Sequence, residues 1–156
     1  MKTIKSPNPI NNNPSLDNHF SIFLAGSIEM GAAEDWQTRL EQELSDKNVN
    51  LFNPRRDEWD SSWEQSILNP QFYQQVNWEL NALDKSNLIV MYFSPETKSP
   101  ISLLELGLYA ASGRMVVCCP EGFWRKGNVD IVCDRYNISN FDSFEKMVEF
   151  LKEYLG

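Results

Sequence analysis

The feature that most constrains the fold is a short apolar run at residues 87–93, followed by a polar loop and then by a segment with strong helix signals at residues 98–113. Ser99 is a residue type that often caps helices, and Pro100 suits the first helical position. Gly113 then supplies a helix stop. A buried strand that leads through a loop into a helix is the repeating unit of α/β folds with a parallel sheet, so we expect such a fold here.

The same unit recurs along the chain. Apolar runs indicate strands at residues 20–25, 48–52 and 115–119, and periodic apolar residues indicate helices at 32–47, at 69–83 and, capped by Asp142, near the C-terminus. A weak last strand, over 131–133 and 136–138, follows a crossover without a clear helix. We predict a flavodoxin-like three-layer α/β fold with a five-stranded parallel sheet. It forms one domain at residues 19–156, after a flexible or extended arm at 1–18 that is rich in Pro and Asn.

Charge and residue usage exclude several classes of function. The net charge of −8 argues against a nucleic-acid partner, because phosphate backbones bind basic faces, but it does not exclude a nucleoside or a single nucleotide. The chain has one histidine, His19, and no CxxC pair, so we expect no metal site, no His-based triad and no cofactor. We expect no membrane partner, because no apolar run is long enough for a transmembrane helix. Three cysteines without framework spacing are typical of reduced thiols and predict a cytoplasmic protein.

Polar loops follow four of the predicted strands, at residues 26–31, 53–63, 94–100 and 120–128. Because the carboxyl ends of parallel strands meet at one edge of a sheet, these loops gather where open α/β folds bind ligands. Backbone N–H groups around Gly26 and Ser27 can hold an anion or a sugar hydroxyl, although a plain tight turn has the same sequence. Asn53, Arg55 and Trp59 belong to a loop that suits either a binding lid or a surface cover over the core.

One carboxylate lies among the apolar residues of the 98–113 segment. Helical spacing places Ser102, Glu105 and Tyr109 on one stripe, with Ser112 after them. The stripe is either a solvated helix face or a set of polar groups directed into a pocket. The convergence of the loops favours the second interpretation, because Glu105 lies in the second turn from the loop edge. Glu79, on the preceding predicted helix, borders an apolar stripe, as a surface residue near the edge of a core does.

Paired carboxylates around a sugar can cleave an N- or O-glycosidic bond without a metal ion. One carboxylate attacks the anomeric carbon of a sugar, and the other handles a proton of the leaving group. A nearby anion stabilises an oxocarbenium-like transition state, and an aromatic side chain can stack on a departing base.

Four segments resemble the nucleoside 2-deoxyribosyltransferase family, in particular its type-two-like domain. They are Phe-Leu-Ala-Gly-Ser-Ile at 23–28, Trp78-Glu79, Ser-Pro-Ile-Ser-Leu-Leu-Glu-Leu-Gly at 99–107 and Gly-Asn-Val at 127–129. The resemblance implies that Glu105, in the Glu-Leu-Gly motif, is the nucleophile that forms a covalent deoxyribosyl intermediate. It implies that Glu79 contacts the base and assists its proton, and that Asn128 reaches the sugar bound by a neighbouring subunit. The implied partners are nucleosides, free purine or pyrimidine bases, and further copies of the chain in a dimer-based homo-oligomer such as a tetramer or hexamer.

The chain departs from this family at two positions. Ser99 stands where better-known members carry an Asp that binds the sugar hydroxyl, so Ser99 and Ser102 are expected to take that role. Phe23 is the aromatic residue nearest to the position of a Tyr that orients the nucleophile, and it has no hydroxyl. Three alternatives stay open. The first is a deoxynucleoside 5′-monophosphate N-hydrolase, with Ser27, Ser99 and Arg55 or Arg56 on the phosphate. The others are a non-catalytic sensor of nucleotide derivatives and a structural or interaction domain with a degenerate site, which a carboxylate among leucines makes less favoured.

Overall fold

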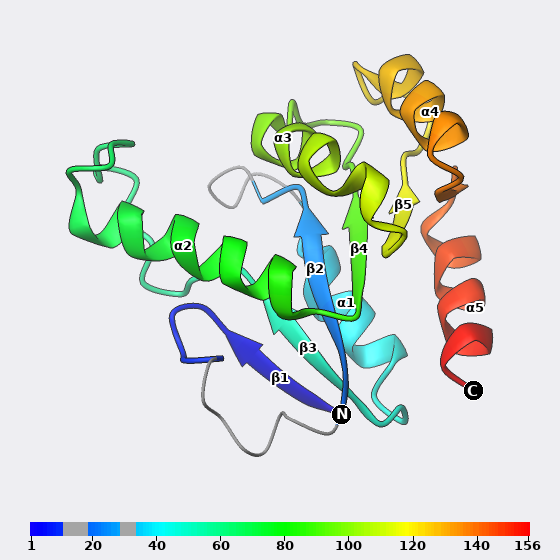
Figure 1. Ribbon diagram of the computed structural model, residues 1–156, viewed down its shortest axis with the longest axis horizontal. Helices are drawn as coiled ribbons and strands as arrows, with labels where there is room; N and C mark the ends of the chain where they lie inside the picture. Colours follow the sequence, from blue (N-terminus) through cyan, green and yellow to red (C-terminus); the bar gives the residue numbers. More distant parts are fainter. Residues whose placement is uncertain (11–18, 29–33) are drawn as a thin grey trace.

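The computed structural model describes residues 1–10, 19–28 and 34–156, and its described part forms a six-stranded parallel sheet flanked by helices (Figure 1). The strands are β1 (Lys2–Lys5), β2 (Phe20–Gly26), β3 (Val49–Asn53), β4 (Leu88–Tyr92), β5 (Met115–Cys118) and β6 (Ser139–Phe141). The helices are α1 (Trp36–Glu43), α2 (Pro70–Lys85), α3 (Pro100–Tyr109), α4 (Lys126–Arg135) and α5 (Phe144–Leu155), and a short 3-10 turn, Ala110–Ser112, extends α3.

The strand order is β1-β3-β2-β4-β5-β6, and every neighbouring pair is parallel. Without β1 this is the flavodoxin-like order, so the predicted fold class is confirmed. The direction of the crossovers reverses between β2 and β4. Open α/β sheets bind their ligands at such a switch point, outside the carboxyl ends of the strands.

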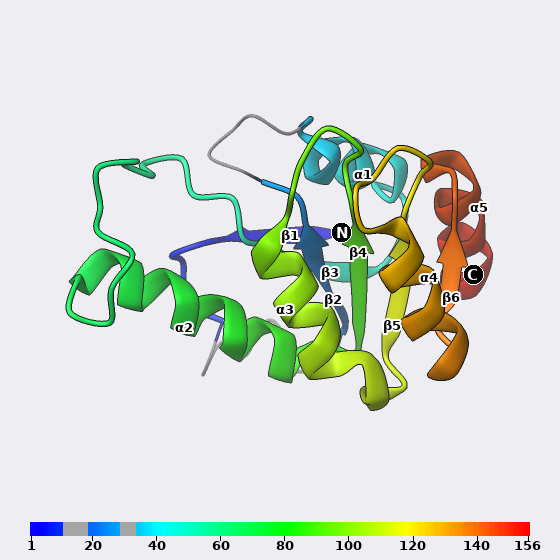
Figure 2. The ribbon, with the colours of Figure 1, turned by 90° about the horizontal axis from the view of Figure 1, so that it is seen from above.

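Two separate apolar cores lie on the two faces of the sheet. Helices α2, α3 and α4 cover one face, and α1 and α5 cover the other (Figure 2). Every residue of β3 and β4 is buried. Strands covered on both faces need continuous apolar runs, which explains why these segments were visible in the sequence.

The predicted number of five strands is wrong by one. Residues 2–5, which we placed in the N-terminal arm, form β1 and pair with β3 at the edge of the sheet. Their sequence, Lys-Thr-Ile-Lys, is too short and polar to stand out as a strand, and only pairing with β3 defines it. Residues 6–10 of the predicted arm follow β1, and residues 11–18 lie outside the described residues, as does the start of the first predicted helix.

The segment after β5 also differs from the prediction. Residues 131–133, predicted as part of a weak strand, belong to α4. Val129 and Cys133 are buried one helical turn apart while Ile131 is exposed, which is a helical pattern that a three-residue apolar run hides. The last strand is β6, at Ser139–Phe141, and the helix cap after it is Ser143 instead of Asp142, because the Ser143 side chain accepts the Lys146 N–H.

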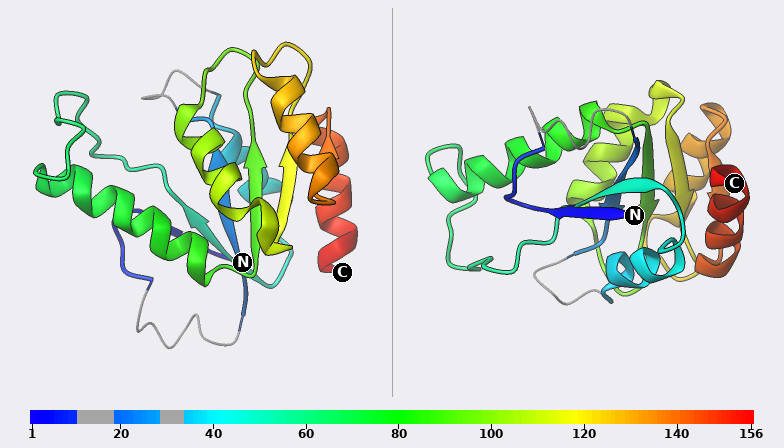
Figure 3. Two further views of the ribbon diagram at one scale, coloured as in Figure 1. Left: turned by 45° about the horizontal axis from the view of Figure 1, so that its top comes forward. Right: turned by 90° about the horizontal axis from the view of Figure 1, so that it is seen from below.

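The loop between β3 and α2 is the longest described connection at the carboxyl edge. This loop and the N-terminal end of α2 project beyond the sheet (Figure 3). No helix within the described ranges combines the length and the apolar character that a bilayer span requires.

Candidate functional site

The candidate site lies at the switch point, where β2 and β4 come very close together. Gly26 pairs with Tyr92 and has a φ of 128°. A Cβ at this position would lie 2.2 Å from the Tyr92 carbonyl oxygen, so any other residue would push the two strands apart. The Ser27 N–H donates to the same carbonyl at 3.0 Å. Gly26 therefore acts on the site through the backbone, by letting the β2 loop pass against β4.

Three buried hydroxyl groups join the loops that leave β2 and β4. The Ser27 Oγ lies 2.9 Å from the Thr97 Oγ1, and the Ser99 Oγ lies 2.6 Å from the same Thr97 atom. Ser27 and Ser99 also bond to each other, and Ser27 accepts the Ser94 N–H at 2.9 Å. These hydroxyl groups fix the loop that begins α3, and hence the position of the helix that carries Glu105.

Ser99 is the N-cap residue of α3, as the sequence predicts, but its side chain makes no capping bond. Its backbone is left-handed, with a φ of 48° and a ψ of 54°. The hydroxyl instead joins the Ser27 and Thr97 cluster. A left-handed backbone costs a non-glycine residue about 1–2 kcal/mol, and such strain is concentrated at functional sites.

Glu105 on α3 and Glu79 on α2 are carboxylates whose charges interact; Glu105 is buried and Glu79 is half-buried. Glu105 is 7% exposed, and burial raises its pKa to about 7. Burial and then the charge of Glu105 raise the pKa of Glu79 well above its ordinary value, while a side-chain hydrogen bond from Gln75 lowers it. The repulsion between the two carboxylates disfavours the doubly ionised pair, so one proton is retained by the pair above the ordinary pKa of a carboxyl group.

The solvated-face interpretation of the α3 stripe is excluded by burial, since Ser102 and Glu105 are 4% and 7% exposed. Tyr109 lies further along the same stripe, but its hydroxyl donates to the Asp84 Oδ1 at 2.5 Å. Burial, followed by this bond, raises the pKa of Tyr109 to about 12. Tyr109 thus ties α3 to the end of α2, while Ser102 lies one turn before Glu105 on the buried face.

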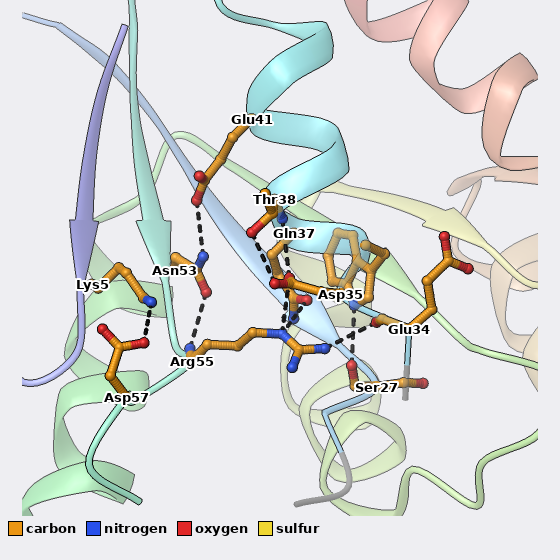
Figure 4. Close-up of polar contacts among 11 residues, drawn as sticks. Lys5, Ser27, Glu34, Asp35, Gln37, Thr38, Glu41, Asn53, Arg55 and Asp57 are labelled. Carbon is orange, nitrogen blue, oxygen red and sulfur yellow. Dashed lines mark hydrogen bonds and ion pairs between the residues drawn. The ribbon is translucent and has the colours of Figure 1, made fainter. Parts of the chain in front are cut away.

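Asn53 and Arg55 lie on the α1 side of the carboxyl edge (Figure 4). The Arg55 Nε donates to the Gln37 Oε1 at 2.8 Å and lies 3.2 Å from an Asp35 oxygen, and an Arg55 Nη donates to the Glu34 carbonyl at 2.9 Å. Asn53 accepts the Arg55 N–H at 3.0 Å and donates to Glu41 at 2.9 Å. These contacts attach the end of β3 to α1. The substrate-binding roles of Asn53 and Arg55 stay predictions.

The loop after β3 gathers aromatic and cationic groups. Trp59 and Trp63 meet edge to face with ring centroids 5.0 Å apart, and the Arg56 guanidinium lies 5.1 Å from the Trp63 ring. The Arg56 side chain is 7% exposed, and its Nη1 atom has no hydrogen-bond partner among the described residues. Trp59 is half-buried in this cluster, and its role as a lid stays a prediction.

Asn128 is exposed in the first turn of α4, and the Gly-Asn-Val segment is helical. Its role in a neighbouring subunit's site stays a prediction. Phe23 is fully buried under α2, where its ring lies 6.5 Å from the Trp78 ring. The residue that sequence reasoning missed is Gln75, one helical turn before Glu79 and buried beside it. Its i, i+4 spacing to Glu79 was the signal that could have found it.

Comparison with known proteins gives one family and a fold match. Residues 19–123 match the family described as "nucleoside 2-deoxyribosyltransferase like". A solved structure described as a conserved protein from Enterococcus faecalis V583 superposes with a TM-score of 0.61 at 18% identity, covering 88% of this chain and 99% of that one. At this identity the likeness shows the fold alone. Curated protein sequences give no significant match.

Proposed function

Because the chain belongs to the nucleoside 2-deoxyribosyltransferase-like family, we propose that it exchanges the base of 2′-deoxynucleosides through a covalent deoxyribosyl intermediate on Glu105. The observation that supports this most is the interacting pair of carboxylates, buried Glu105 and half-buried Glu79. Burying an ionisable group without a countercharge costs free energy, so a group that is kept in such a place is a candidate functional group. The switch point supplies the position that a ligand needs, and the two carboxylates supply a nucleophile and an acid.

The proposed reaction follows the protonation of the pair. Ionised Glu105 attacks C1′ of the sugar, the C1′–N bond breaks, and its electrons go to the base nitrogen system. Glu79 gives its proton to the departing base. A second base then attacks C1′, Glu105 leaves as a carboxylate, and the proton lost by the incoming base returns to Glu79. A water molecule in place of the second base would yield hydrolysis.

Chromatography of 2′-deoxyinosine incubated with cytosine and the protein tests the proposal. We expect deoxycytidine, formed only when cytosine is present. Glu105→Gln should lower the rate by about 10³-fold or more, since the nucleophile is lost, and Glu79→Gln by about 10²-fold. Glu149→Gln, at an exposed position of α5, is the matched control. A wild-type rate from Glu105→Gln, or no exchange by the wild type, overturns the assignment.

Arg56 favours one alternative substrate class. Its buried guanidinium, with a free Nη1 among the described residues, is the kind of group that pairs with a phosphate oxygen. The alternative is a deoxynucleoside 5′-monophosphate N-hydrolase that uses the same carboxylates with water. Release of free base from the monophosphates, at a rate above that from nucleosides and lost in Arg56→Met, would establish it.

We also propose that the active form is a homo-oligomer in the cytoplasm. The outer face of α3 is apolar and open to solvent, with Ile101, Leu104 and Leu108 each more than half exposed. Gly107 lies on the same face with free space around its Cα. Such a stripe on the helix of the nucleophile is suited to a second copy of the chain. Light scattering of wild type and Leu104→Glu measures this: the variant should shift toward the monomer.

A further inference from the structure

The N-terminal segment passes along the helix that carries Glu79. We use the name N-terminal strap for residues 6–10, which follow β1. The Ser6 N–H donates to the Asn53 carbonyl at 3.1 Å, the Trp78 Nε1 donates to the Asn8 carbonyl at 2.7 Å, and the Lys85 Nζ donates to the Ile10 carbonyl at 2.9 Å. Ile10 is 2% exposed and belongs to the core of this face. The N-terminal strap is therefore attached along much of the length of α2.

Gln75 connects the N-terminal strap to the carboxylate pair. Its Oε1 accepts the buried Ser6 hydroxyl, and its Nε2 donates to the Pro54 carbonyl at 2.9 Å. Because the Pro54 carbonyl can only accept, the amide nitrogen must face Pro54 and the amide oxygen Ser6; the nitrogen also has a second hydrogen. The second hydrogen is available to Glu79, which lies one helical turn further along α2, at the i, i+4 spacing at which helical side chains meet.

We propose that Gln75 is a positioning residue for Glu79, held in its working orientation by Ser6 of the N-terminal strap. The inference rests on the proposed function, since it assigns a role in the carboxylate pair described above. It makes the N-terminal strap part of the catalytic apparatus: Ser6 fixes the amide, the amide fixes the Glu79 carboxyl, and the charges of Glu79 and Glu105 interact. A structural role alone would need the bonds to Ser6 and Pro54 but not the one to Glu79.

We call the series Ser6, Gln75 and Glu79 the relay, and it predicts a change in the pKa of Glu79 when Gln75 is replaced. The Gln75 N–H stabilises the ionised form of Glu79, against burial and against the charge of Glu105 on α3. Removing the donor should therefore make Glu79 release its proton at a higher pH. Because the proposed reaction needs a protonated Glu79, the alkaline limb of kcat/KM for base exchange should move upward by about one pH unit in Gln75→Leu. The maximum kcat should fall about tenfold with little change in KM, because the acid is no longer oriented.

The matched control is Gln74→Leu, the same substitution at the adjacent, exposed position of α2. Ser6→Ala is the second variant. Ser6→Ala keeps Gln75 but removes the hydrogen bond to its oxygen. The alkaline limb of kcat/KM should therefore move in the same direction by a smaller amount. This variant also provides the test if Gln75→Leu does not fold. A direct readout is the ¹³C chemical shift of the Glu79 carboxyl, assigned with Glu79→Gln and followed by NMR as a function of pH.

The outcomes separate the inference from the proposed function. An upward shift of the Glu79 titration in Gln75→Leu and Ser6→Ala, absent in Gln74→Leu, supports the relay even if the wild type exchanges no bases. The same Glu79 titration in all four proteins overturns the relay, even if exchange activity is present. A fall in activity of Gln75→Leu accompanied by an equal fall in Gln74→Leu also overturns it, since the loss would then reflect the helix and not the amide.

Discussion

The two sides of the carboxyl edge bury polar groups in opposite ways. On the α1 side, Arg55 is paired with Gln37, Asp35 and the Glu34 carbonyl, and its cation has a compensating anion within 3.2 Å. On the α2 and α3 side, Glu105 lies beside a second carboxylate, Glu79, whose pKa is raised by burial and by Glu105. Both sides are built by segments that follow strands of the same sheet. The paired Arg55 stabilises the fold, whereas the two carboxylates lower its stability, which is the pattern expected of groups retained for function.

Changing Glu105 should produce the largest effect on the free energy of unfolding. The substitution should stabilise the protein, whereas loss of a structural contact would destabilise it. The pKa of Glu105 is about 7 in the folded protein and about 4.5 in the unfolded chain, so the folded state binds the proton more tightly. The resulting stability is full below pH 4.5 and is lost as the pH rises toward 7. Glu105→Gln should therefore be about 3 kcal/mol more stable than wild type at pH 8, with the difference vanishing near pH 4.5.

Urea unfolding of wild type and Glu105→Gln at several pH values measures this difference. Glu149→Gln, on the exposed side of α5, should show no such pH dependence. A Glu105→Gln variant that is less stable than wild type at pH 8 would mean that the carboxylate is structurally paired, and the contrast between the two sides of the edge would fail.

Changing Arg55 should give a smaller loss with no effect on the carboxylate pair. Arg55→Met removes the donors to Gln37 and the Glu34 carbonyl and leaves the fully buried Gln37 oxygen without its partner, which should cost about 2 kcal/mol. Thermal unfolding measures the loss, and Arg135→Met at the exposed end of α4 is the control. A raised KM with unchanged stability would instead place Arg55 in the substrate site.

Changing Ser99 should give the smallest effect on stability. Two substitutions at this position distinguish the cost of its left-handed backbone from the loss of its hydroxyl hydrogen bonds. Ser99→Ala and Ser99→Gly both remove the buried hydroxyl, but only glycine accepts a φ of 48° without cost. We expect the glycine variant to be about 1 kcal/mol more stable than the alanine variant. Chemical denaturation of the two proteins gives the difference. Equal stabilities would show that the left-handed turn at the start of α3 stores no strain.

The sequence predicted the central strands because a parallel strand covered on both faces must be apolar throughout. For the same reason it missed β1: an edge strand of four mostly polar residues acquires its structure from the hydrogen bonds of β3, which lies far along the chain. Residues 131–133 are short enough to fit either a strand or a helix, and packing of Val129 and Cys133 against the core decides for α4.

The residues of the candidate site also fall into those that local sequence patterns predict and those that only tertiary packing defines. The sequence by itself determined Glu105 in a helix that starts at the loop edge, Glu79 on the preceding helix, and Gly26 and Ser27 at the end of the first long strand, because local patterns and strand order are encoded locally. Only the tertiary structure decided that Ser99 bonds to Ser27 and Thr97 instead of capping α3, that Arg55 faces α1, and that Ser6 reaches Gln75. Side-chain hydrogen bonds depend on which groups remain unpaired after the chain has packed, and that is a property of the whole fold.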